Sequence, residues 1–325
     1  MRLTLAIMTD MHVGSTITNR WHNRFLSDQP EETAVHTVAA INARNPDLVL
    51  VLGDLSDTAT SPQLHRARGV LESLKAPWVA CRGNHDRPPE SPPSPPTNGS
   101  EALTLVQEIV EHVHPPDTSE VADTWDRWLG MHAVIGLVPP DTAPLPEGVV
   151  LVVFDADWWT ADDGIFRVAI DDEQINAIEA ALDAAPRKPD LLIVACHFPF
   201  VRQTEHLRQM APDAKNAGTL QDGQVIIDRL APLAHRSLWF CGHQHFHQIV
   251  CSPDAGDLPQ WLHCTTASLA EFPAEYRLVT IAATSVTIHT ETAVPDLLHA
   301  KPPRTSWVRG REQDREFVWE TGDRS

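Results

Sequence analysis

The stretch NPDLVLVLGDLSD, residues 45–57, contains the pattern on which the fold depends. A run rich in leucine and valine is followed at once by Gly53 and two acidic residues, Asp54 and Asp57. A near-continuous apolar run of this length is typical of a strand that is buried on both faces. The glycine allows the backbone to turn sharply after the strand. The stretch therefore predicts a buried strand with a polar site beyond its carboxyl end.

Similar apolar runs recur on both sides of this stretch, at residues 3–9, 77–81, 148–154, 190–196 and 237–241. Further strands are expected near the end of the chain, at residues 262–269, 276–283 and 285–292. The apolar spacing of amphipathic helices is found in three intervening segments, residues 30–44, 61–75 and 171–185. This alternation predicts an α/β layered fold, although it does not specify the order of the strands.

Residues 88–147 differ from the rest of the chain. They contain 12 of the 27 prolines, open with PPESPPSPPTNGS, and continue with a helical stretch at 101–114 and a tryptophan-containing segment at 121–132. A proline-rich tract cannot continue a central strand or helix. We interpret these residues as an insertion on the core, either a lid or, for its first part, a surface loop.

The charge balance is strongly acidic. The chain has 25 Lys and Arg against 44 Asp and Glu, a formal net charge of −19. This balance opposes broad binding to nucleic acid, which depends on many cationic contacts with phosphate. Bound metal ions would offset part of the negative charge locally.

The remaining composition favours a cytoplasmic protein. No apolar run approaches the roughly 20 residues of a membrane-spanning helix. A strand pattern begins at Leu3, which leaves no room for a cleavable signal peptide. Five cysteines, an odd number without zinc-finger spacing, favour reduced thiols over a disulfide framework.

Polar residues of similar kinds follow five of the apolar runs. The five motifs are Asp10-Met11-His12, Gly53-Asp54 with Asp57, Gly83-Asn84-His85-Asp86, His197-Phe198-Pro199 and Gly242-His243-Gln244-His245. Each motif alone is a weak signal, because a chain with 17 histidines contains accidental pairs. All five in order, each behind an apolar run, indicate one shared site at the carboxyl ends of the strands.

The residue types in these motifs suit metal-dependent hydrolysis. Carboxylate, amide oxygen and imidazole are ligands for Mn, Fe and Zn, and a carboxylate can span two ions. Two close divalent ions clamp a phosphoryl group, lower the pKa of a bridging water and stabilise the leaving oxygen. The motifs therefore predict hydrolysis of a phosphate ester by a metal-bridging hydroxide.

The series DMH, GDLSD, GNHD, HFP and GHQH resembles the calcineurin-like metallophosphoesterase superfamily. The resemblance covers roughly residues 3–290, including SLAEFPAEYRLVTI at 268–281, but not residues 88–147. It implies an α/β fold of four layers, an αββα sandwich with two central mixed β-sheets flanked by helices. We expect a metallophosphoesterase domain over residues 1–290, interrupted by the insertion, and a C-terminal tail over residues 291–325.

The resemblance also implies two metal sites that share one carboxylate. The residues expected to hold one metal are Asp10, His12 and His245. Those expected to hold the other are Asn84, His197 and His243, and the shared, bridging carboxylate is Asp54.

Two further residues acquire roles from the same resemblance. His85 follows the ligand Asn84 and is expected to reach the substrate phosphate as an electrostatic stabiliser or general acid. Asp57 resembles a residue that orients its neighbours from outside the metal shell.

Within the superfamily the motifs favour small phosphodiesterases. The purple acid phosphatases carry a ligand tyrosine where this chain has Asp57, and the only tyrosine here, Tyr276, is far from any motif. The Asp-Arg-Gly continuation of the Ser/Thr protein phosphatases is missing as well. The pattern is most similar to bacterial class III cyclic-nucleotide phosphodiesterases. It predicts cleavage of a cyclic nucleotide, a similar small diester or a small phosphomonoester.

Two alternatives stay open. DMHVG and GNHD also resemble repair exonucleases of the superfamily, although the net charge and the lack of a basic stretch count against a nuclease. A non-catalytic, protein-binding scaffold of the same fold would show gaps in the ligand set, and the sequence has none.

The expected cofactors are two divalent metal ions, Mn²⁺ and/or Fe, with Zn²⁺ as an alternative because these ligands accept all three. The expected partner is a small phosphate ester. The oligomeric state and the substrate itself have no readable motif.

Several residues near the motifs have a structural interpretation. Cys81, Cys196 and Cys241 each precede an expected ligand by one to three positions, and free cysteine commonly packs as a small apolar residue. His247 follows the last motif and is expected at the surface or in the core. Asp155, Asp157, Trp158 and Trp159 close the fourth run, where substrate contact and ordinary packing are both open. Trp125 and Trp128, in the insertion, are expected to be core.

Overall fold

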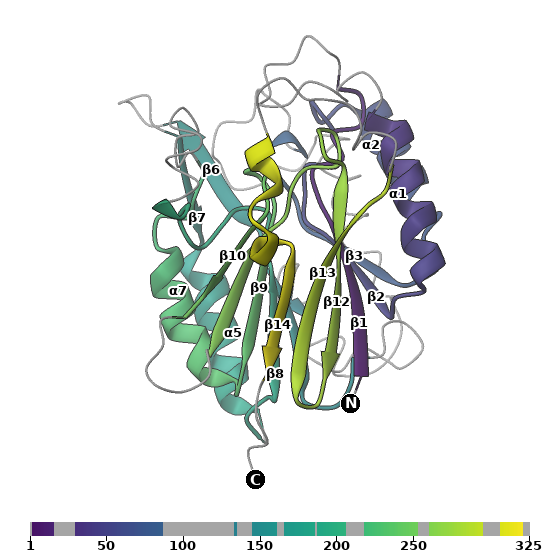
Figure 1. Ribbon diagram of the computed structural model, residues 1–325. Coiled ribbons are helices and arrows are strands. Elements are labelled where there is room, and N and C mark those ends of the chain that lie inside the picture. Colours follow the sequence, from purple (N-terminus) through teal and green to yellow (C-terminus); the bar gives the residue numbers. More distant parts are fainter. Residues whose placement is uncertain are drawn as a thin grey trace, which may run out of the picture.

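Two β-sheets pack face to face in the centre of the molecule, and helices cover their outer faces (Figure 1). The computed structural model describes residues 2–15, 30–86, 133–134, 145–160, 166–185, 187–205, 218–252, 260–294 and 306–320. This arrangement confirms the predicted α/β fold with two central mixed sheets flanked by helices.

The first sheet joins the beginning of the chain to its end. Its order is β14-β13-β12-β1-β2-β3. The strands are β1 (Arg2–Met8), β2 (Leu48–Val51), β3 (Trp78–Ala80), β12 (Glu275–Ala282), β13 (Ser285–Thr292) and β14 (Glu316–Glu320). β1, β2 and β3 are parallel, whereas β12, β13 and β14 pair antiparallel. The sheet is therefore mixed, and β1 lies where the two pairing modes meet.

The second sheet is built from the middle of the chain. Its order is β10-β11-β9-β8-β5-β4. The strands are β4 (Ala133–Val134), β5 (Val149–Val153), β8 (Leu191–Ala195), β9 (Ser237–Cys241), β10 (Gln248–Cys251) and β11 (Trp261–Thr265). β5, β8, β9 and β11 are parallel, and β4 and β10 pair antiparallel at the edges.

The strands are apolar on both faces because each sheet is covered on both sides. In β1, Leu3, Leu5 and Ile7 pack between the sheets, while Ala6 and Met8 face the outer helices. In β8, alternate residues divide in the same way between the inner core and the other outer layer. This burial explains the near-continuous apolar runs in the sequence.

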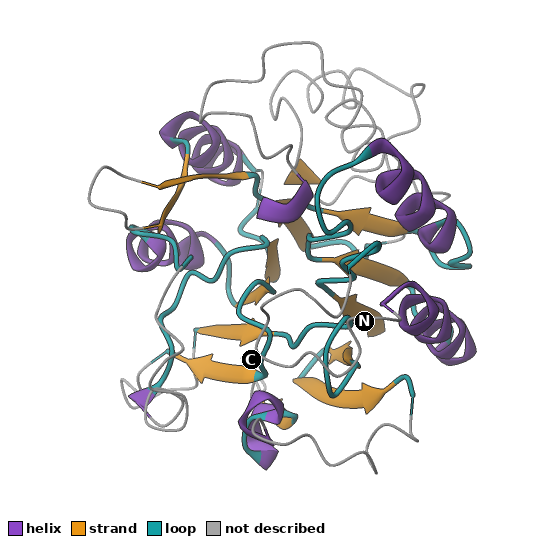
Figure 2. Ribbon diagram, turned by 90° about the horizontal axis from the view of Figure 1, so that it is seen from above, coloured by secondary structure: helices purple, strands orange, loops and turns teal. Residues whose placement is uncertain are grey.

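In the described part of the chain, helices form both outer layers (Figure 2). α1 (Pro30–Arg44) and α2 (Ser61–Leu71) cover the first sheet, and α5 (Asp172–Ala184) and α7 (Gly223–Leu230) cover the second. Buried residues in α5 recur at helical spacing, at Ile175, Ile178 and Leu182. The Asp171 carboxylate caps α5 by accepting the N–H of Glu173 at 2.8 Å. The expected helix at 61–75 ends earlier, at Leu71, and α7 was not predicted.

A two-stranded hairpin and four short 3₁₀ turns complete the described elements. The hairpin pairs β6 (Ala156–Thr160) with β7 (Phe166–Ile170). The 3₁₀ turns are η2 (Asn84–Asp86), η4 (Ala231–Leu233), η6 (Ser306–Arg309) and η7 (Glu312–Asp314).

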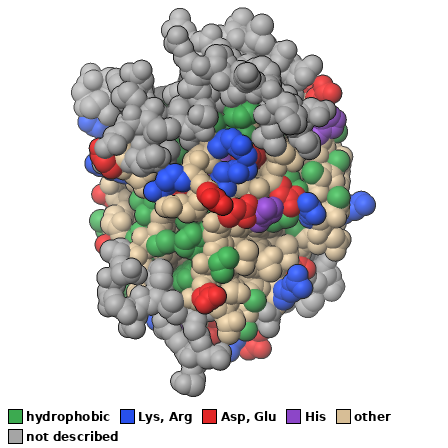
Figure 3. Space-filling view, viewed as in Figure 1, with side chains coloured by type: hydrophobic (Ala, Val, Ile, Leu, Met, Phe, Trp, Pro, Cys, Tyr) green, Lys and Arg blue, Asp and Glu red, His purple; other side chains and the backbone are tan. Residues whose placement is uncertain are grey.

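The C-terminal segment packs against both sheets. β14 pairs with β13, while Asp314 of η7 accepts the N–H of Ile249 in β10 at 3.0 Å. In Figure 3, acidic, basic and histidine side chains gather near the centre of the face on which this segment lies. On the neighbouring strands β13 and β14, His289 and Glu316 form an ion pair at 2.6 Å. Residues 306–320 thus contribute β14 and two 3₁₀ turns to the described fold.

Much of the expected insertion lies outside the described residues. This holds for the helical stretch 101–114 and for residues 121–132, with Trp125 and Trp128. Within 88–147, residues 133–134 form β4 at the edge of the second sheet. The division into a domain over 1–290 and a tail over 291–325 stays a prediction. Among the described helices, none has the length and apolar character needed to cross a membrane.

Candidate metal centre

The five motifs lie beyond the carboxyl ends of five strands. One motif follows each of β1, β2 and β3 in the first sheet and each of β8 and β9 in the second. Because these strands are parallel within each sheet, their motifs meet at one edge. A hydrogen bond then joins the two sheets, since the backbone N–H of His243 donates to Asp10 Oδ2 at 3.2 Å.

One cluster combines two carboxylates and two imidazoles. Its members, each offering a ligand atom within 4.8 Å of the others, are Asp10, His12, Asp54 and His245. His245 Nε2 lies 2.9 Å from Asp10 Oδ1 and 3.3 Å from His12 Nε2. All four residues are buried.

A second cluster shares Asp54 with the first and adds His197 and His243. His197 Nε2 lies 3.3 Å from Asp54 Oδ2 and 3.2 Å from His243 Nδ1. Asn84 belongs to the same group, because its Oδ1 is 3.2 Å from His197 Nε2. Asp54 Oδ2 also lies 3.5 Å from His12 Nε2, so this carboxylate stands between the two clusters.

The side-chain oxygen and nitrogen atoms that converge in the two clusters are suited to binding cations. Ring nitrogens face each other between His12 and His245 and again between His197 and His243. Asp10 Oδ1 is buried, lies 2.9 Å from His245 Nε2 and 3.7 Å from His12 Nε2, and has no hydrogen bond of ordinary geometry in the described part of the chain. Buried acceptor atoms are costly unless they are hydrogen-bonded or bind a cation. Oxygen and imidazole nitrogen together suit Mn, Fe or Zn, so the residues could hold two such ions.

Hydrogen bonds behind the rings select which nitrogen faces the clusters. His197 Nδ1 lies 2.7 Å from the Leu52 carbonyl oxygen. A carbonyl only accepts, so Nδ1 carries a hydrogen, and Nε2 is the nitrogen that faces Asp54 and can take up a proton or a cation. His85 is held in the same way, with Nδ1 2.6 Å from the Asp57 carbonyl oxygen.

The backbone adopts the left-handed conformation at five of the seven expected ligands. These residues, with φ between 43° and 66°, are Asp10, His12, Asp54, His243 and His245. Positive φ is uncommon outside glycine and typically costs about 1–3 kcal/mol where the surroundings impose it. Its concentration in one place indicates that the loops are shaped for the side chains they present, and sites of this kind are commonly functional.

Asp86 ties the second motif to the third, a role that the sequence did not suggest. Its carboxylate accepts the backbone N–H groups of Leu55, Ser56 and Gly83 at 3.1, 2.9 and 3.0 Å. Burial and the neighbouring Asp54 carboxylate raise the pKa of Asp86 to about 6. The side chain thereby holds the loops of Asp54 and Asn84 together. The only signal in the sequence was its place at the end of GNHD.

Burial and charge divide the histidines into two kinds. Burial lowers the pKa of His12 and that of His243 to about 3, so both rings are neutral and able to bind a cation. Burial also acts on His197, but the Asp54 carboxylate outweighs it and raises the pKa of His197 to about 9. The Asp10 carboxylate has the same effect on His245 and raises its pKa well above the ordinary value. A cation and a proton therefore compete at His197 and His245.

His85 lies at the rim of the first cluster. Its ring packs edge-on against His12, with centroids 4.7 Å apart, and its side chain is 32% exposed. The carboxylate of Asp57 is 4.0 Å from His85 Nδ1, and Asp57, His85 and His12 offer ligand atoms within 4.8 Å of one another. The structure thus places every expected site residue at one edge of the two sheets, and their roles as ligands stay a prediction.

Most of the residues near the motifs that were expected to have a structural role lie in the core. Cys81, Cys196 and Cys241 are buried free thiols, as predicted, and burial raises the pKa of each. His247 is fully buried, with Nε2 3.2 Å from Glu275 Oε2. Asp155 forms an ion pair with Arg82.

The aromatic residues after β5 differ in exposure from these core residues. Trp158 and Trp159 are half-buried, and Trp158 stacks on Phe166, with ring centroids 5.5 Å apart. Asp157 is exposed.

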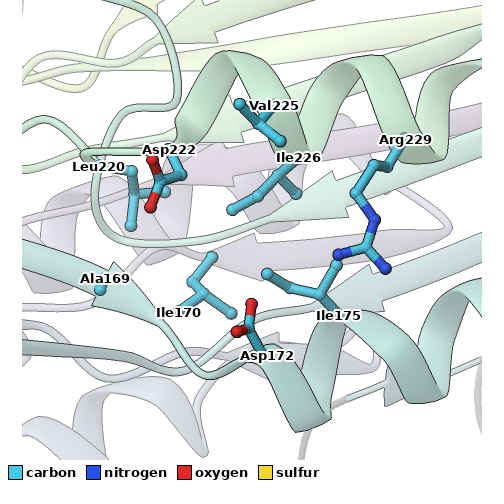
Figure 4. Close-up of a pocket in the computed structure, with 9 residues that line it drawn as sticks. All are labelled: Ala169, Ile170, Asp172, Ile175, Leu220, Asp222, Val225, Ile226 and Arg229. Carbon is cyan, nitrogen blue, oxygen red and sulfur yellow. The ribbon is translucent and has the colours of Figure 1, made fainter.

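A separate pocket of about 110 Å³ lies between β7, α5 and α7 (Figure 4). Apolar residues such as Ile170, Ile175 and Ile226 line it, with Asp172 and Asp222 at its margin. None of the expected site residues, all of which the structure describes, lines this pocket.

Two curated relatives match part of the chain. A "probable cyclic nucleotide phosphodiesterase" from Synechococcus sp. is 34% identical over 88 residues, which are 27% of this chain and 33% of the relative. Another protein of that description, from Rhodopseudomonas palustris, is 31% identical over 87 residues, which are 26% of this chain and 30% of the relative. The chain thus spans a third or less of the length of these relatives.

The fold and the family agree with the motifs. A dimetal phosphatase from Danio rerio superposes with a TM-score of 0.59 over 98% of this chain and 99% of its own, at 11% identity, which shows a shared fold. A sequence profile described as "Calcineurin-like phosphoesterase" matches residues 3–247. This family uses two divalent metal ions, and the two clusters could bind them. The chain therefore belongs to the calcineurin-like phosphoesterase family.

Proposed function

We propose that the chain hydrolyses a phosphodiester with two divalent metal ions held at the edge where the carboxyl ends of its two sheets meet. The observation that carries the proposal is the position of Asp54, whose carboxylate belongs to both clusters. In this proposal Asp54 would contribute its carboxylate to both ions. The residues that would hold one ion are Asp10, His12 and His245, and those that would hold the other are Asn84, His197 and His243.

The bound ions would polarise the phosphoryl group and make water a stronger nucleophile. The chain itself supplies their spacing. The Leu52 carbonyl keeps Nε2 of His197 directed at its cluster, and Asp86 fixes the loop of Asp54 against that of Asn84. Burial keeps His12 and His243 unprotonated, which metal binding requires.

His85 is proposed as the group that acts on the substrate. Its Nδ1–H donates to the Asp57 carbonyl oxygen, which directs the opposite nitrogen away from that anchor. The ring lies at the rim of the first cluster and is partly exposed, within reach of a phosphate seated on the metals. From there it would stabilise charge on the phosphoryl oxygens or protonate the leaving oxygen.

Replacement of His85 by alanine is expected to lower kcat by about 10²–10⁴-fold, the usual contribution of a general acid. Both metals should stay bound, because His85 is not among the proposed ligands. Metal content after gel filtration and steady-state kinetics would be measured on the same sample. His289→Ala, in an exposed side chain of β13, is the matched control and should behave as wild type. A fully active His85 variant would contradict the assigned role.

The preference for a diester rests on the motifs and on the description of the two partial relatives. We propose a cyclic nucleotide or a similar small diester as the substrate class. Mn²⁺ or Fe is the proposed metal, with Zn²⁺ also compatible with the ligands.

The test begins with protein stripped by a chelator and restored with Mn²⁺. Hydrolysis of bis-p-nitrophenyl phosphate is compared with that of p-nitrophenyl phosphate, and 3′,5′-cyclic AMP is assayed in parallel. Metal-dependent cleavage that favours the diester supports the proposal. Faster cleavage of the monoester would instead show that the protein is a phosphomonoesterase. Two bound metals with no cleavage of any of the three would favour a non-catalytic role.

A further inference from the structure

Glu271 is a buried acid with no assigned role. It lies in the loop between β11 and β12 and is 1% exposed. Across the described ranges of the chain, neither of its carboxylate oxygens has a hydrogen bond of ordinary geometry. A buried carboxylate is costly unless a cationic or hydrogen-donating group faces it.

The group that faces Glu271 is the ring of His245. Glu271 Oε2 lies 3.4 Å from His245 Nδ1, somewhat longer than the roughly 2.7–3.2 Å of a well-formed N–H···O bond. The other ring nitrogen, Nε2, faces the first cluster, 2.9 Å from Asp10 Oδ1. The imidazole therefore stands between Glu271 on one side and the proposed metal position on the other.

The backbone holds Glu271 in this place. The N–H groups of Leu269 and Ala270 donate to the carbonyl oxygens of Thr9 and Asp10, each at 3.1 Å. The hydroxyl of Ser268 also donates to the Asp10 carbonyl, at 2.9 Å. The loop that carries Glu271 is thus fastened to the motif after β1, which carries two of the proposed ligands.

An ionised carboxylate accepts hydrogen bonds but donates none. Placed against Nδ1, it keeps the hydrogen on that nitrogen and leaves the lone pair of Nε2 for a metal. His197 has a neutral carbonyl, that of Leu52, in the equivalent place. A carboxylate draws the N–H hydrogen more strongly than a carbonyl does and makes the ring a better electron donor.

We propose that Glu271 is a positioning residue that orients His245 and raises metal affinity at the cluster of Asp10, His12 and His245. The inference rests on the proposed function, because it needs those residues to be ligands. Under this proposal, one histidine at each metal position is oriented by a different kind of group. A carboxylate accepts from Nδ1 of His245, and a backbone carbonyl accepts from Nδ1 of His197.

The chain offers a matched control at Glu275. Glu275 is also fully buried and lies 3.2 Å from a histidine, His247. Arg309 and Arg315 pair with its other oxygen. Removing this charge tests the loss of a buried carboxylate near GHQH without altering a proposed ligand.

The experiment titrates Mn²⁺ into four chelator-stripped proteins: wild type, Glu271→Gln, Glu271→Met and Glu275→Gln. Calorimetry measures the affinity of each site for Mn²⁺, and electron paramagnetic resonance measures the concentration of free Mn²⁺. Circular dichroism first confirms that each variant is folded. Glu271→Gln should weaken one of the two sites by about 10–100-fold, the usual effect of losing an outer partner, and leave the other unchanged. Glu271→Met, which retains only a weak thioether acceptor, should weaken the same site further. Glu275→Gln should bind both ions as wild type does.

The outcomes separate this inference from the proposed function. If wild type binds two ions and both Glu271 variants bind them equally tightly, the positioning role is overturned while the function stands. Equal weakening at both sites, or the same loss in Glu275→Gln, would also overturn it, because the effect would then be structural. If wild type binds no ion, the proposed function itself fails.

Discussion

Replacement of Asp54 by asparagine is expected to abolish metal loading at both sites and phosphoesterase activity with it. The carboxylate lies 3.5 Å from His12 and 3.3 Å from His197, so it serves both clusters. An amide has the same shape but no charge, and its nitrogen cannot bind a cation. The loss should exceed the roughly 10–100-fold that an outer partner contributes to metal affinity. Metal content after dialysis and hydrolysis of bis-p-nitrophenyl phosphate measure the two effects.

Asparagine is the appropriate substitution because the backbone of Asp54 is left-handed, with φ of 51°. Asparagine tolerates this conformation better than most residues, so the fold should be kept. Asp47→Asn is the control, since Asp47 is an exposed acid at the opposite end of β2. An Asp54→Asn protein that kept two metals and wild-type activity would contradict the bridging role.

Replacement of Gly53 by alanine is expected to destabilise the protein by at least about 2 kcal/mol. Gly53 has φ of 83°, a conformation that costs a residue with a Cβ roughly 1–2 kcal/mol. The added Cβ would also lie 2.7 Å from the Gly83 backbone nitrogen and 2.7 Å from His197 Nδ1. Neither neighbour can retreat easily, because one is backbone and the other is held by Leu52. Denaturant unfolding at equilibrium measures the change.

Gly69→Ala provides the control of opposite sign. Gly69 lies inside α2, and an added Cβ meets no atom within 4 Å. Alanine there should stabilise the protein by about 0.4–1 kcal/mol, because it restricts the unfolded chain. Equal unfolding midpoints for wild type and Gly53→Ala would show that the loop can relax, against the prediction.

The local patterns in the sequence were sufficient to predict a layered α/β fold, and the family resemblance added its two central mixed sheets. Residues 30–44 were predicted to be helical and form α1, and the run at 47–53 contains β2. α7 was missed because it has only eight residues. β14 was missed because its pairing with β13 depends on a partner that is distant in the sequence. Periodicity describes one element at a time and does not predict which strands will meet.

The residues of the site also differ in how well the sequence predicts them. The residues expected as ligands could be identified because each follows a strand within a short motif, as Asp54 follows β2. Glu271 was missed because it belongs to no such motif and approaches His245 only after the loop folds against Asp10. Asp86 was visible in GNHD, but its bonds to Leu55 and Ser56 depend on how two loops meet.

The strands of the first sheet come from both ends of the sequence, which affects how the chain folds during synthesis. β1, β2 and β3 are complete by Ala80, yet β12, which pairs with β1, begins at Glu275. A ribosome that adds about 5–20 residues per second would need roughly 10–40 s to cover the interval of about 195 residues. Until then the antiparallel edge of β1 stays open to wrong pairing. Nascent chains should therefore depend on holding chaperones until the last strands emerge.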